Sequence, residues 1–161
     1  MTSRSIRAAG SADARRLARL NDVGVHALHV DRRPDVFQAV SRDELAAWYT
    51  EMLEKPGVDA WIATRDGEDV GYTLMMEHAR PRSPFTHARR WCEIDQIAVL
   101  PAARGQGIAR ALVETATLAA RARGIAHVEL TVWSFNEAAR AAFERLGFRP
   151  RILRMERGEP G

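Results

Sequence analysis

The sequence predicts a mixed α/β (α+β) fold in a single domain that spans residues 1–161. A chain of 161 residues is long enough to bury one full core and hardly long enough for two. Hydrophobic residues make up 46% and charged residues 28%, which is usual for a globular protein. Six strand-like runs are interleaved with four segments whose apolar residues recur every three or four positions, and no repeat or long linker divides them.

The composition argues against a membrane protein, a zinc protein and a disulfide-bonded protein. No apolar run approaches the roughly 20 residues that cross a bilayer, and residues 1–20 lack the apolar core of a signal peptide. Cys92 is the only cysteine, so an internal disulfide and a thiol cluster for zinc are both excluded. We therefore expect a cytoplasmic protein with no metal and no membrane partner.

The charge balance gives no reason to expect a nucleic-acid partner. The chain has 24 basic and 21 acidic residues, a net charge of +3. Four arginines surround the loop that contains Phe85, namely Arg80, Arg82, Arg89 and Arg90. They lack the interleaved aromatic residues of a base-stacking surface, so a solvated loop is expected, with Phe85 at a substrate entrance.

The N-terminal third predicts one strand and two helices. Residues 5–9 form a short strand, and residues 11–29 form a helix capped by Ser11 or Asp13. An irregular connection with a turn at residues 34–35 follows. The next helix opens on a capping box, because a glutamate follows a serine by three residues in the string SRDE, and Pro-Gly at residues 56–57 ends it.

The middle of the chain predicts a hairpin and a further strand. Asp66-Gly67 lies between two strand-like runs within residues 58–77, which is a strong hairpin signal. Residues 79–90 are rich in proline and arginine and predict a loop. Residues 91–99 predict the fourth strand. Trp48, Trp61 and Trp133 are most simply core residues.

The C-terminal part predicts two helices interleaved with strands. A helix begins near Arg104, buries a face that includes Leu118, and ends at Gly124. Residues 127–133 predict the fifth strand. Ser134 and a glutamate three residues later form a second capping box for a helix that Gly147 ends, and residues 148–157 predict a sixth strand.

The stretch VLPAARGQGIARAL, residues 99–112, places a proline and two glycines between a strand and a helix. Helix N-termini present unpaired N–H groups and a partial positive charge, and therefore bind phosphate. Gly105 and Gly107 lack a Cβ, so an anion can approach the backbone. Arg104 adds a cation. This pattern predicts a phosphate-binding loop.

Three kinds of phosphate loop fit to different degrees. A Walker loop requires Gly-Lys-Ser/Thr after its spacer, and no such string is present. A dinucleotide fingerprint requires a small residue at position 110, where this chain has Arg110, and its glycines follow the strand directly. The third kind is a pyrophosphate loop of the pattern Arg-Gly-x-Gly-x-Ala.

This stretch resembles the acetyl-CoA-binding motif of the GNAT N-acetyltransferase superfamily. The later string NEAARAAFERLGF, residues 136–148, resembles the second motif of that family. The resemblance runs from about residue 4 to 156 and is specific over residues 91–150. It implies a mostly antiparallel sheet of about six to seven strands with about four helices, splayed between the fourth and fifth strands.

The resemblance also implies the site. Acetyl-CoA, used as a co-substrate without a metal, lies in the splay, and the Ile97 N–H polarises the thioester carbonyl. Asn136 either contacts the cofactor or only caps a helix. The residues expected to bind acetyl-CoA or CoA are Ile97, Ala98, Val99, Arg104, Gly105, Gln106, Gly107, Ile108, Ala109, Arg110, Asn136 and Phe143.

An amine is protonated at pH 7 and must lose a proton before it attacks. Glu93 lies where several family members carry their general base, and it is the expected catalytic residue, unless it only pairs with the substrate or with water. Asp95 is the weaker candidate, two residues along the same face. Many relatives place a tyrosine at the position of Phe143 to protonate the thiolate. Phe143 lacks that proton, and a thiolate with a pKa near 8.5 leaves tolerably without help.

The expected function is N-acetyl transfer to a primary amine by direct attack in a ternary complex. The alternatives are a non-catalytic acetyl-CoA-binding protein and a nicotinamide-dependent oxidoreductase. The acceptor is a small-molecule amine or a protein amine, and a homodimer is a family-level expectation. His26 and His29 border the expected acceptor cleft but favour packing roles. Cys92 is expected to be a buried strand residue. The acidic residues compatible with a polyamine or aminoglycoside are Asp31, Asp43, Glu44 and Glu51.

Overall fold

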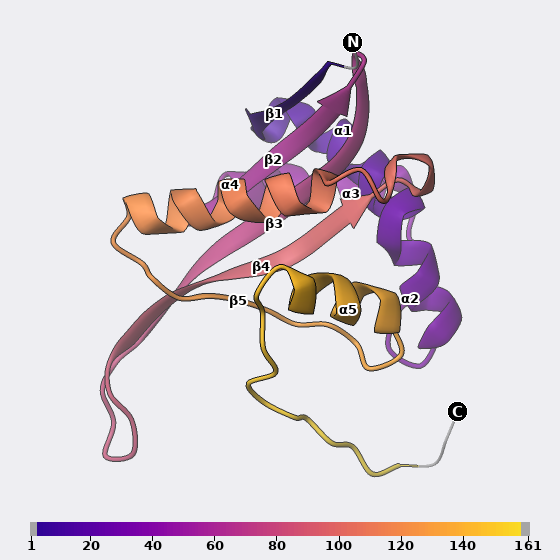
Figure 1. The fold of residues 1–161 in the computed structure, drawn as a ribbon. Coiled ribbons are helices and arrows are strands. Elements are labelled where there is room, and N and C mark those ends of the chain that lie inside the picture. The colour runs from indigo at the N-terminus through magenta and orange to yellow at the C-terminus, as the bar shows by residue number, and fades with distance from the viewer. Residues whose placement is uncertain (1–2, 159–161) are drawn as a thin grey trace.

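The computed structural model describes residues 3–158 and contains one five-stranded sheet in the order β1-β2-β3-β4-β5 (Figure 1). The first four strands pair antiparallel, whereas β4 and β5 pair parallel. This arrangement confirms the predicted mixed, mostly antiparallel fold class. The strands are β1 Arg4–Ala9, β2 Val58–Arg65, β3 Glu68–Arg80, β4 Arg89–Val99 and β5 Val128–Leu130.

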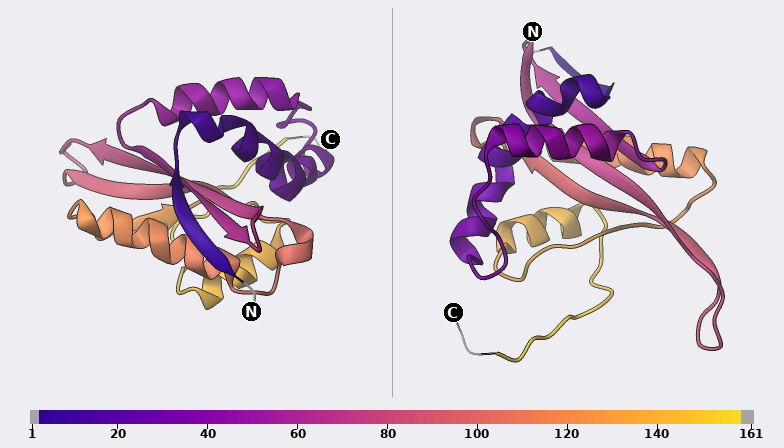
Figure 2. Two further views of the ribbon diagram at one scale, coloured as in Figure 1. Left: turned by 90° about the horizontal axis from the view of Figure 1, so that it is seen from above. Right: turned by 180° about the vertical axis from the view of Figure 1, so that it is seen from behind.

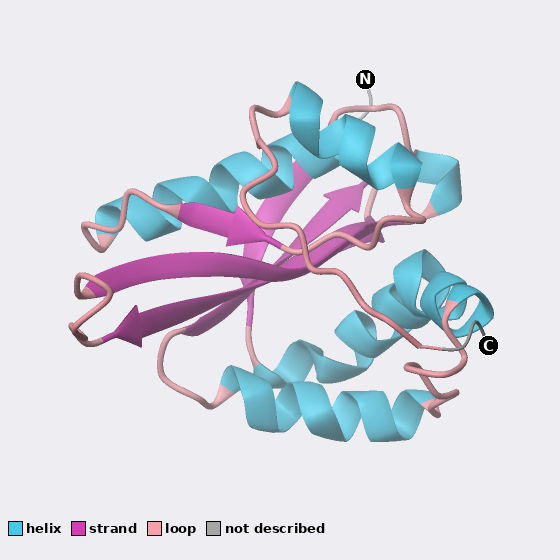
Figure 3. Cartoon of the chain, turned by 90° about the horizontal axis from the view of Figure 1, so that it is seen from below, coloured by secondary structure: helices cyan, strands magenta, loops and turns pink. Residues whose placement is uncertain are grey.

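Helices cover both faces of the sheet, as Figures 2 and 3 show. The helices α1 and α3 pack together on one face, and α4 packs against the strands on the other. α1 continues through a π-helical turn, η2, into α2. The helical segments are α1 Ala14–Asn21, η2 Asp22–His26, α2 Ala27–Arg32, α3 Arg42–Leu53, α4 Ile108–Ala122 and α5 Glu137–Arg145.

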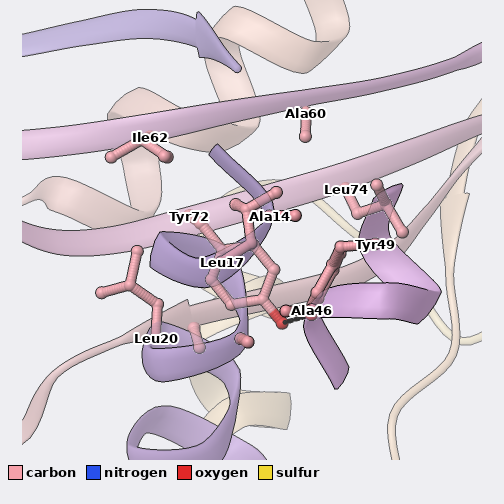
Figure 4. Close-up of a cluster of buried hydrophobic side chains, with 11 residues drawn as sticks. Ala14, Leu17, Leu20, Ala46, Tyr49, Ala60, Ile62, Tyr72 and Leu74 are labelled. Atoms are coloured by element: carbon pink, nitrogen blue, oxygen red, sulfur yellow. Dashed lines mark hydrogen bonds between the residues drawn. The ribbon is translucent and has the colours of Figure 1, made fainter. Parts of the chain in front are cut away.

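A hydrophobic core lies on each face. Leu17 and Leu20 of α1 and Tyr49 of α3 are fully buried against Tyr72 and Leu74 of β3 (Figure 4). On the other face the buried cluster consists of Met75, Cys92, Ile94, Val113, Ala116, Ala120 and Ile125. Burying large apolar side chains stabilises the fold by about 1.5–3 kcal/mol each, so both helical layers are firmly attached to the sheet.

Several local signals act as the sequence predicts. Ser41 caps α3, because its Oγ accepts from the Glu44 N–H at 3.2 Å while Glu44 accepts from the Ser41 N–H at 2.9 Å. Asp66 and Gly67 have φ of 50° and 85° and form the tight turn between β2 and β3. β3 and β4 are longer than predicted and reduce the connecting loop to residues 81–88.

Other helix starts differ from the prediction. α4 begins at Ile108 rather than near Arg104, because the 3₁₀ turn η3 Pro101–Ala103 and two left-handed glycines precede it. The cap of α5 is Asn136, whose Oδ1 accepts from the Ala139 N–H at 3.2 Å, and not Ser134.

The first helix also differs from the prediction. A 3₁₀ turn, η1 Ser11–Asp13, precedes α1 and has Gly10 at its N-cap, and the Gly10 N–H donates to the Asp13 carboxylate at 3.2 Å. Asp13, one of the two predicted caps, is the N-cap residue of α1, but its side chain makes no capping hydrogen bond to that helix. Ser11 makes no cap, and the helical segment reaches Arg32 instead of ending near His29.

The expected sixth strand is absent from the described part of the chain. Residues 148–157 have no strand pairing and lie across the outside of the molecule (Figure 1). Phe148 packs against the core beneath α4, but Ile152 and Leu153 are 79% and 82% exposed, so apolar contacts hold only the start of this segment. Pro150 removes one ladder donor, and β5 offers only three paired residues. The segment is instead attached by an ion pair between Arg151 and Glu129.

Two expectations about buried residues are wrong. Leu118 is 64% exposed, because the buried face of α4 runs through residues 108, 112, 113, 116 and 120. Trp48 is 37% exposed, whereas Trp61 and Trp133 are half-buried. Within residues 3–158, no helix is long and apolar enough to cross a membrane.

Candidate active site

The sheet opens between β4 and β5. The parallel ladder joins only residues 92–94 of β4 to residues 128–130 of β5. β4 continues to Val99, while the chain beyond Leu130 leaves the sheet toward α5 (Figure 1). Residues 95–99 therefore have an unpaired edge on the β5 side, in agreement with the predicted splay between the fourth and fifth strands.

A β-bulge lies where the splay begins. Leu74 is opposite Gln96 and Met75 is opposite Ile94, so Asp95 is an extra residue without a partner in β3. Before the bulge, the Cys92 N–H points toward the β5 side and donates to the His127 carbonyl at 3.0 Å. After it, the Leu100 N–H points toward β3 and donates to the Val70 carbonyl at 2.8 Å.

The bulge decides which backbone groups face the splay. Because backbone groups alternate in direction along an antiparallel pair, residues 96, 98 and 100 point their groups toward β3. The backbone groups of Ile97 and Val99 consequently point into the open edge. These are two of the residues that the sequence predicts to contact acetyl-CoA, and Ala98 lies between them with its side chain buried on the α1 face.

A buried polar network lies beside the bulge, on the face of the sheet covered by α1 and α3. The Gln96 Oε1 accepts from the hydroxyls of Tyr49 at 2.5 Å and Tyr72 at 2.8 Å. The Asn21 amide donates to the Tyr72 hydroxyl at 2.7 Å. Burial raises the pKa of Tyr72 to about 12 and raises that of Tyr49 further, so both hydroxyls stay protonated. The network joins α1, α3 and β3 to the bulged part of β4.

The glycine loop carries a run of unpaired donors. Gly105 and Gly107 have φ of 73° and 76°, a region that favours glycine. The Arg104 N–H donates to the Pro101 carbonyl at 3.2 Å, and the Ala111 N–H donates to the Gly107 carbonyl at 3.1 Å. Among the described residues, the backbone N–H groups of positions 105–110 have no backbone acceptor. The expected anion site therefore begins at Gly105, since the Arg104 N–H is already bonded.

The side chains of the loop have structural partners. The Arg104 guanidinium donates to the Val99 carbonyl at 3.0 Å and to the Gly24 carbonyl at 3.1 Å, so it ties the loop to the end of β4 and to η2. The Ile108 side chain is buried in the core, so only its backbone faces the loop. Ala109 is half-buried, and the exposed Arg110 lies 3.8 Å from Glu114.

Two arginines beside the loop were not expected from the sequence. The Arg4 guanidinium donates to the Gln106 carbonyl at 2.6 Å, and Arg65 donates to the Gln106 side chain. Arg4 and Arg65 are directly opposite each other in the β1–β2 pair. Like charges in opposed positions destabilise a sheet, so the two arginines could have been noticed only once the β1–β2 register was known.

The candidate base, Glu93, lies on β4 two residues before the bulge and is half-buried. Its carboxylate lies 3.3 Å from the His78 Nε2, and the Thr131 hydroxyl donates to it at 3.4 Å. The His78 ring stacks on Trp91 with centroids 5.2 Å apart. Glu93 therefore lies between β3 and the first residue after β5, at the opening of the splay.

Asp95 is the bulged residue, so the regular alternation that would place it with Glu93 is interrupted there. Asp95 is an exposed residue, but the surrounding protein partly desolvates its carboxyl group, and this desolvation raises the pKa of the carboxyl. Gln96 and His78 oppose that rise by favouring the charged form. The carboxyl is thus close enough to His78 to feel its charge.

The second family motif lies on the far side of the splay. The Asn136 Oδ1 caps α5, which establishes its helix-cap role and leaves its amide nitrogen available. Phe143 packs edge-to-face on Phe148 at 5.9 Å, in keeping with a packing role. Cys92 is fully buried, and burial raises the pKa of its thiol, so the expectation of an inert strand residue is confirmed.

An aromatic cluster joins α2 and the loop after it to the segment between β5 and α5. Phe37 stacks on His29 at 4.8 Å and meets the Trp133 ring edge-on at 5.5 Å. His26 Nε2 lies 2.9 Å from the Gln38 carbonyl, so both histidines have the packing roles favoured by the sequence. Phe85 instead lies 95% exposed on the loop between β3 and β4, away from this cluster (Figure 1).

Two of the acidic residues considered for a cationic acceptor already have partners. Asp43 pairs with Arg15 at 3.0 Å, and Glu44 belongs to the capping box of α3. Neither is directed at the splay. Within residues 3–158, no cluster of three histidine, cysteine, aspartate or glutamate side chains has the arrangement of a metal site.

Comparison with known sequences identifies relatives of this chain. The chain is 43% identical over 68 residues to the mycothiol acetyltransferase of Beutenbergia cavernae, a match that covers 42% of this chain and 23% of that protein. It spans 23% to 58% of the length of the curated relatives it matches.

Solved structures agree over nearly the whole chain. The tetramutant of the BH1408 protein from Bacillus halodurans has a TM-score of 0.89 at 25% identity, covering 96% of this chain and 99% of that one. The aminoglycoside N-acetyltransferase AAC(6')-Iy in complex with CoA shares the fold, with a TM-score of 0.76 at 17% identity, covering 99% and 97%. Residues 23–148 match the family model described as Acetyltransferase (GNAT) family, and the chain therefore belongs to this family.

Proposed function

We propose that this protein transfers the acetyl group of acetyl-CoA to a primary amine by direct attack in a ternary complex. The observation that carries the proposal is the open edge of β4 beside the glycine loop. Ile97 points its backbone N–H and carbonyl into the splay and Val99 its N–H, the Val99 carbonyl being bonded by Arg104, and among the described residues the six N–H groups of positions 105–110 have no backbone acceptor. Family membership supports the same reaction.

The residues present fit acetyl-CoA. A Cβ built on Gly105 would meet no atom within 4 Å, and one on Gly107 would meet only the Arg4 guanidinium at 3.6 Å. The bare glycine backbone is thus open to a pyrophosphate, and the first turn of α4 supplies donors and a favourable dipole. Acetyl-CoA would supply the activated thioester. Backbone groups of Ile97 and Val99 would pair with its pantetheine arm, with the Ala98 backbone directed toward β3.

Different residues of this chain would carry out different parts of the reaction. The Ile97 N–H would donate to the thioester oxygen as negative charge develops there. Glu93 would accept the proton that the ammonium must lose before attack. Phe143 has no acidic proton, so the thiolate would leave without a side-chain acid and take its proton from water or the attacking nitrogen. Asn136 would offer its free amide nitrogen to the cofactor side.

We also propose a class of acceptor, an oligomeric state and a cellular location for the protein. Asp95 would attract the cationic amine, which would be part of a small molecule or a protein. The relatives named for mycothiol and aminoglycosides make small-molecule amines the first to test. A homodimer is proposed from the family, and a cytoplasmic location from the single buried cysteine.

The test is release of free thiol from acetyl-CoA with a panel of primary amines. Aminoglycoside, polyamine and peptide amines cover the classes above. Thermal unfolding with acetyl-CoA measures binding separately, since a ligand at a hundred times its Kd stabilises the fold by about 2.7 kcal/mol, and NAD serves as the negative control. Stabilisation without turnover on any amine would instead support a non-catalytic acetyl-CoA-binding protein.

A further inference from the structure

His78 has an unusual position for a side chain outside both family motifs. It lies on β3, directly across from Trp91 of β4, and its ring stacks on the indole at an interplanar angle of 20°. This stacking fixes the ring plane. The ring therefore presents a constant edge to the candidate base, Glu93.

The two nitrogens of this ring lie in different surroundings. The Nε2 is buried, makes no hydrogen bond among the described residues, and lies 3.3 Å from the Glu93 carboxylate. The side chain as a whole remains 36% exposed. One edge of the ring therefore faces the candidate base while the rest of the ring reaches solvent.

A buried imidazole nitrogen without a hydrogen bond is costly unless a partner compensates it. The Glu93 carboxylate is the polar group nearest to this nitrogen, and a small rotation of either side chain would give the two groups hydrogen-bonding geometry. His is also the side chain whose charge changes most readily near neutral pH. The charged groups that bear on the imidazole are Glu93 and Asp95 of β4, and Arg89, whose guanidinium lies over the shared Trp91 ring.

We propose that His78 is a positioning residue for Glu93 that also relays its proton to solvent. The proposal rests on the proposed function, because it assumes that Glu93 is the base. It adds a residue that neither family motif contains. Trp91 is part of the same device, since it holds the imidazole plane.

The relay conserves every proton. Glu93 takes a proton from the ammonium, so the carboxylate becomes a carboxylic acid and the amine becomes neutral. The new O–H bond then breaks as its proton passes to the His78 Nε2, which restores the carboxylate and forms an imidazolium. The imidazolium releases its Nδ1 proton to water, which leaves the Nε2–H tautomer. Proton exchange with water, a gain at Nδ1 and a loss at Nε2, restores the Nδ1–H tautomer before the next turnover, and no electron changes hands.

The kinetic test compares His78→Gln, Glu93→Gln and the double variant, with His87→Gln on the exposed loop as the matched control. The assay is thiol release with the best amine of the panel. We expect His78→Gln to lower kcat about tenfold with little change in the KM for acetyl-CoA. The double variant should be no slower than Glu93→Gln within about twofold, because both residues serve one path. Free imidazole should restore activity to His78→Ala and not to Glu93→Gln.

A second measurement does not depend on turnover. The imidazole nitrogen resonances of His78 are recorded by NMR in wild type and in Glu93→Gln, and the Nε2 resonance should shift in the variant because the carboxylate that lies 3.3 Å from it is gone. An unchanged Nε2 resonance would overturn the pairing. A normal kcat in His78→Gln across the pH range would overturn the relay, even if Glu93→Gln is inactive. Full activity in Glu93→Gln would refute the proposed base itself, and the two failures are thus distinguishable.

Discussion

Gly24 in the π-helical turn η2 lies directly against Ala98 of β4. A Cβ built on Gly24 would stand 2.7 Å from the Ala98 Cβ, closer than side-chain carbons approach in proteins. The Gly24 carbonyl also accepts from Arg104, whose guanidinium binds the Val99 carbonyl. The turn and the end of β4 are therefore held together at the part of the strand that faces the splay.

Replacing Gly24 by alanine overpacks the contact with the Ala98 Cβ, at a cost of about 1–3 kcal/mol. The gain of about 1 kcal/mol in helix propensity offsets part of this cost, so the free energy of unfolding should fall by up to about 2 kcal/mol. Chemical denaturation measures the effect. Gly10→Ala is the control, since a Cβ at Gly10 meets nothing within 4 Å. Equal stability of the two variants would mean that η2 does not press on β4.

The glycine loop allows a comparison at nearly constant backbone strain. Gly105 and Gly67 both have left-handed φ, 73° and 85°, and a Cβ on either meets no atom within 4 Å. Gly105→Ala and Gly67→Ala should thus lose similar stability. Gly105→Ala alone should weaken acetyl-CoA binding by at least tenfold, about 1.4 kcal/mol, as measured by calorimetry. Unchanged affinity would remove the loop from the cofactor site.

Glu93→Gln keeps the size of the side chain and removes its ability to accept a proton. We expect kcat to fall by ~10²–10⁴ while the Kd for acetyl-CoA stays the same. The loss should shrink as pH rises toward the pKa of the amine, because free amine needs no base. Asp95→Asn is the matched comparison and should mainly raise the KM of a cationic amine. A deficit that is constant with pH would make Glu93 a substrate-positioning residue.

Tyr72→Phe tests the network beneath the bulge. The variant deprives Gln96 of one donor and leaves the Asn21 amide facing a buried ring. An unsatisfied buried polar group costs about 1–3 kcal/mol, and denaturation should show a loss of that size. Thr115→Val serves as control, because its hydroxyl bonds only the Ala111 carbonyl within α4. A loss no greater than that of the control would show that the network is not coupled to the fold.

The carboxyl of Asp13 should make part of the free energy of unfolding sensitive to acid. The hydrogen bond from Arg7 is the main cause that lowers the pKa of this carboxyl below its ordinary value of 3.8. A carboxyl whose pKa is lowered on folding stabilises the fold above that ordinary pKa. Its contribution is lost as pH falls through the lower value of the folded state. Asp13→Asn should therefore destabilise the protein at pH 7, and the difference from wild type should shrink in acid. A constant difference would exclude this linkage.

Features set by short-range chemistry were predictable from the sequence. The Ser41 capping box, the Asp66-Gly67 turn and the glycine loop each require particular residues at fixed spacing, and each is present as expected. The choice between Ser134 and Asn136 was harder. Both are good caps, and only the structure shows that Asn136 is the residue whose side chain accepts from the first turn of α5.

Features set by long-range pairing were not predictable. Residues 148–157 alternate enough to suggest a strand, but a strand needs an edge to pair with, and a three-residue β5 provides too little. His78 and the arginines beside the loop come from β1, β2 and β3, far from either motif in sequence. Only the pairing register brings His78 to Glu93 and brings Arg4 to Gln106.

The extra residue, Asp95, changes which face of the sheet the even-numbered side chains of β4 occupy. Ahead of it, Cys92 and Ile94 belong to the core beneath α4. Beyond it, Ala98 belongs to the opposite core beneath α1. If Asp95 instead took a regular place in the ladder, opposite Leu74, each residue beyond it would move to the other face of the sheet, and the Ile97 N–H would turn toward β3. The one extra residue thus sets which side chains beyond it enter each hydrophobic layer and which backbone groups are left for a ligand.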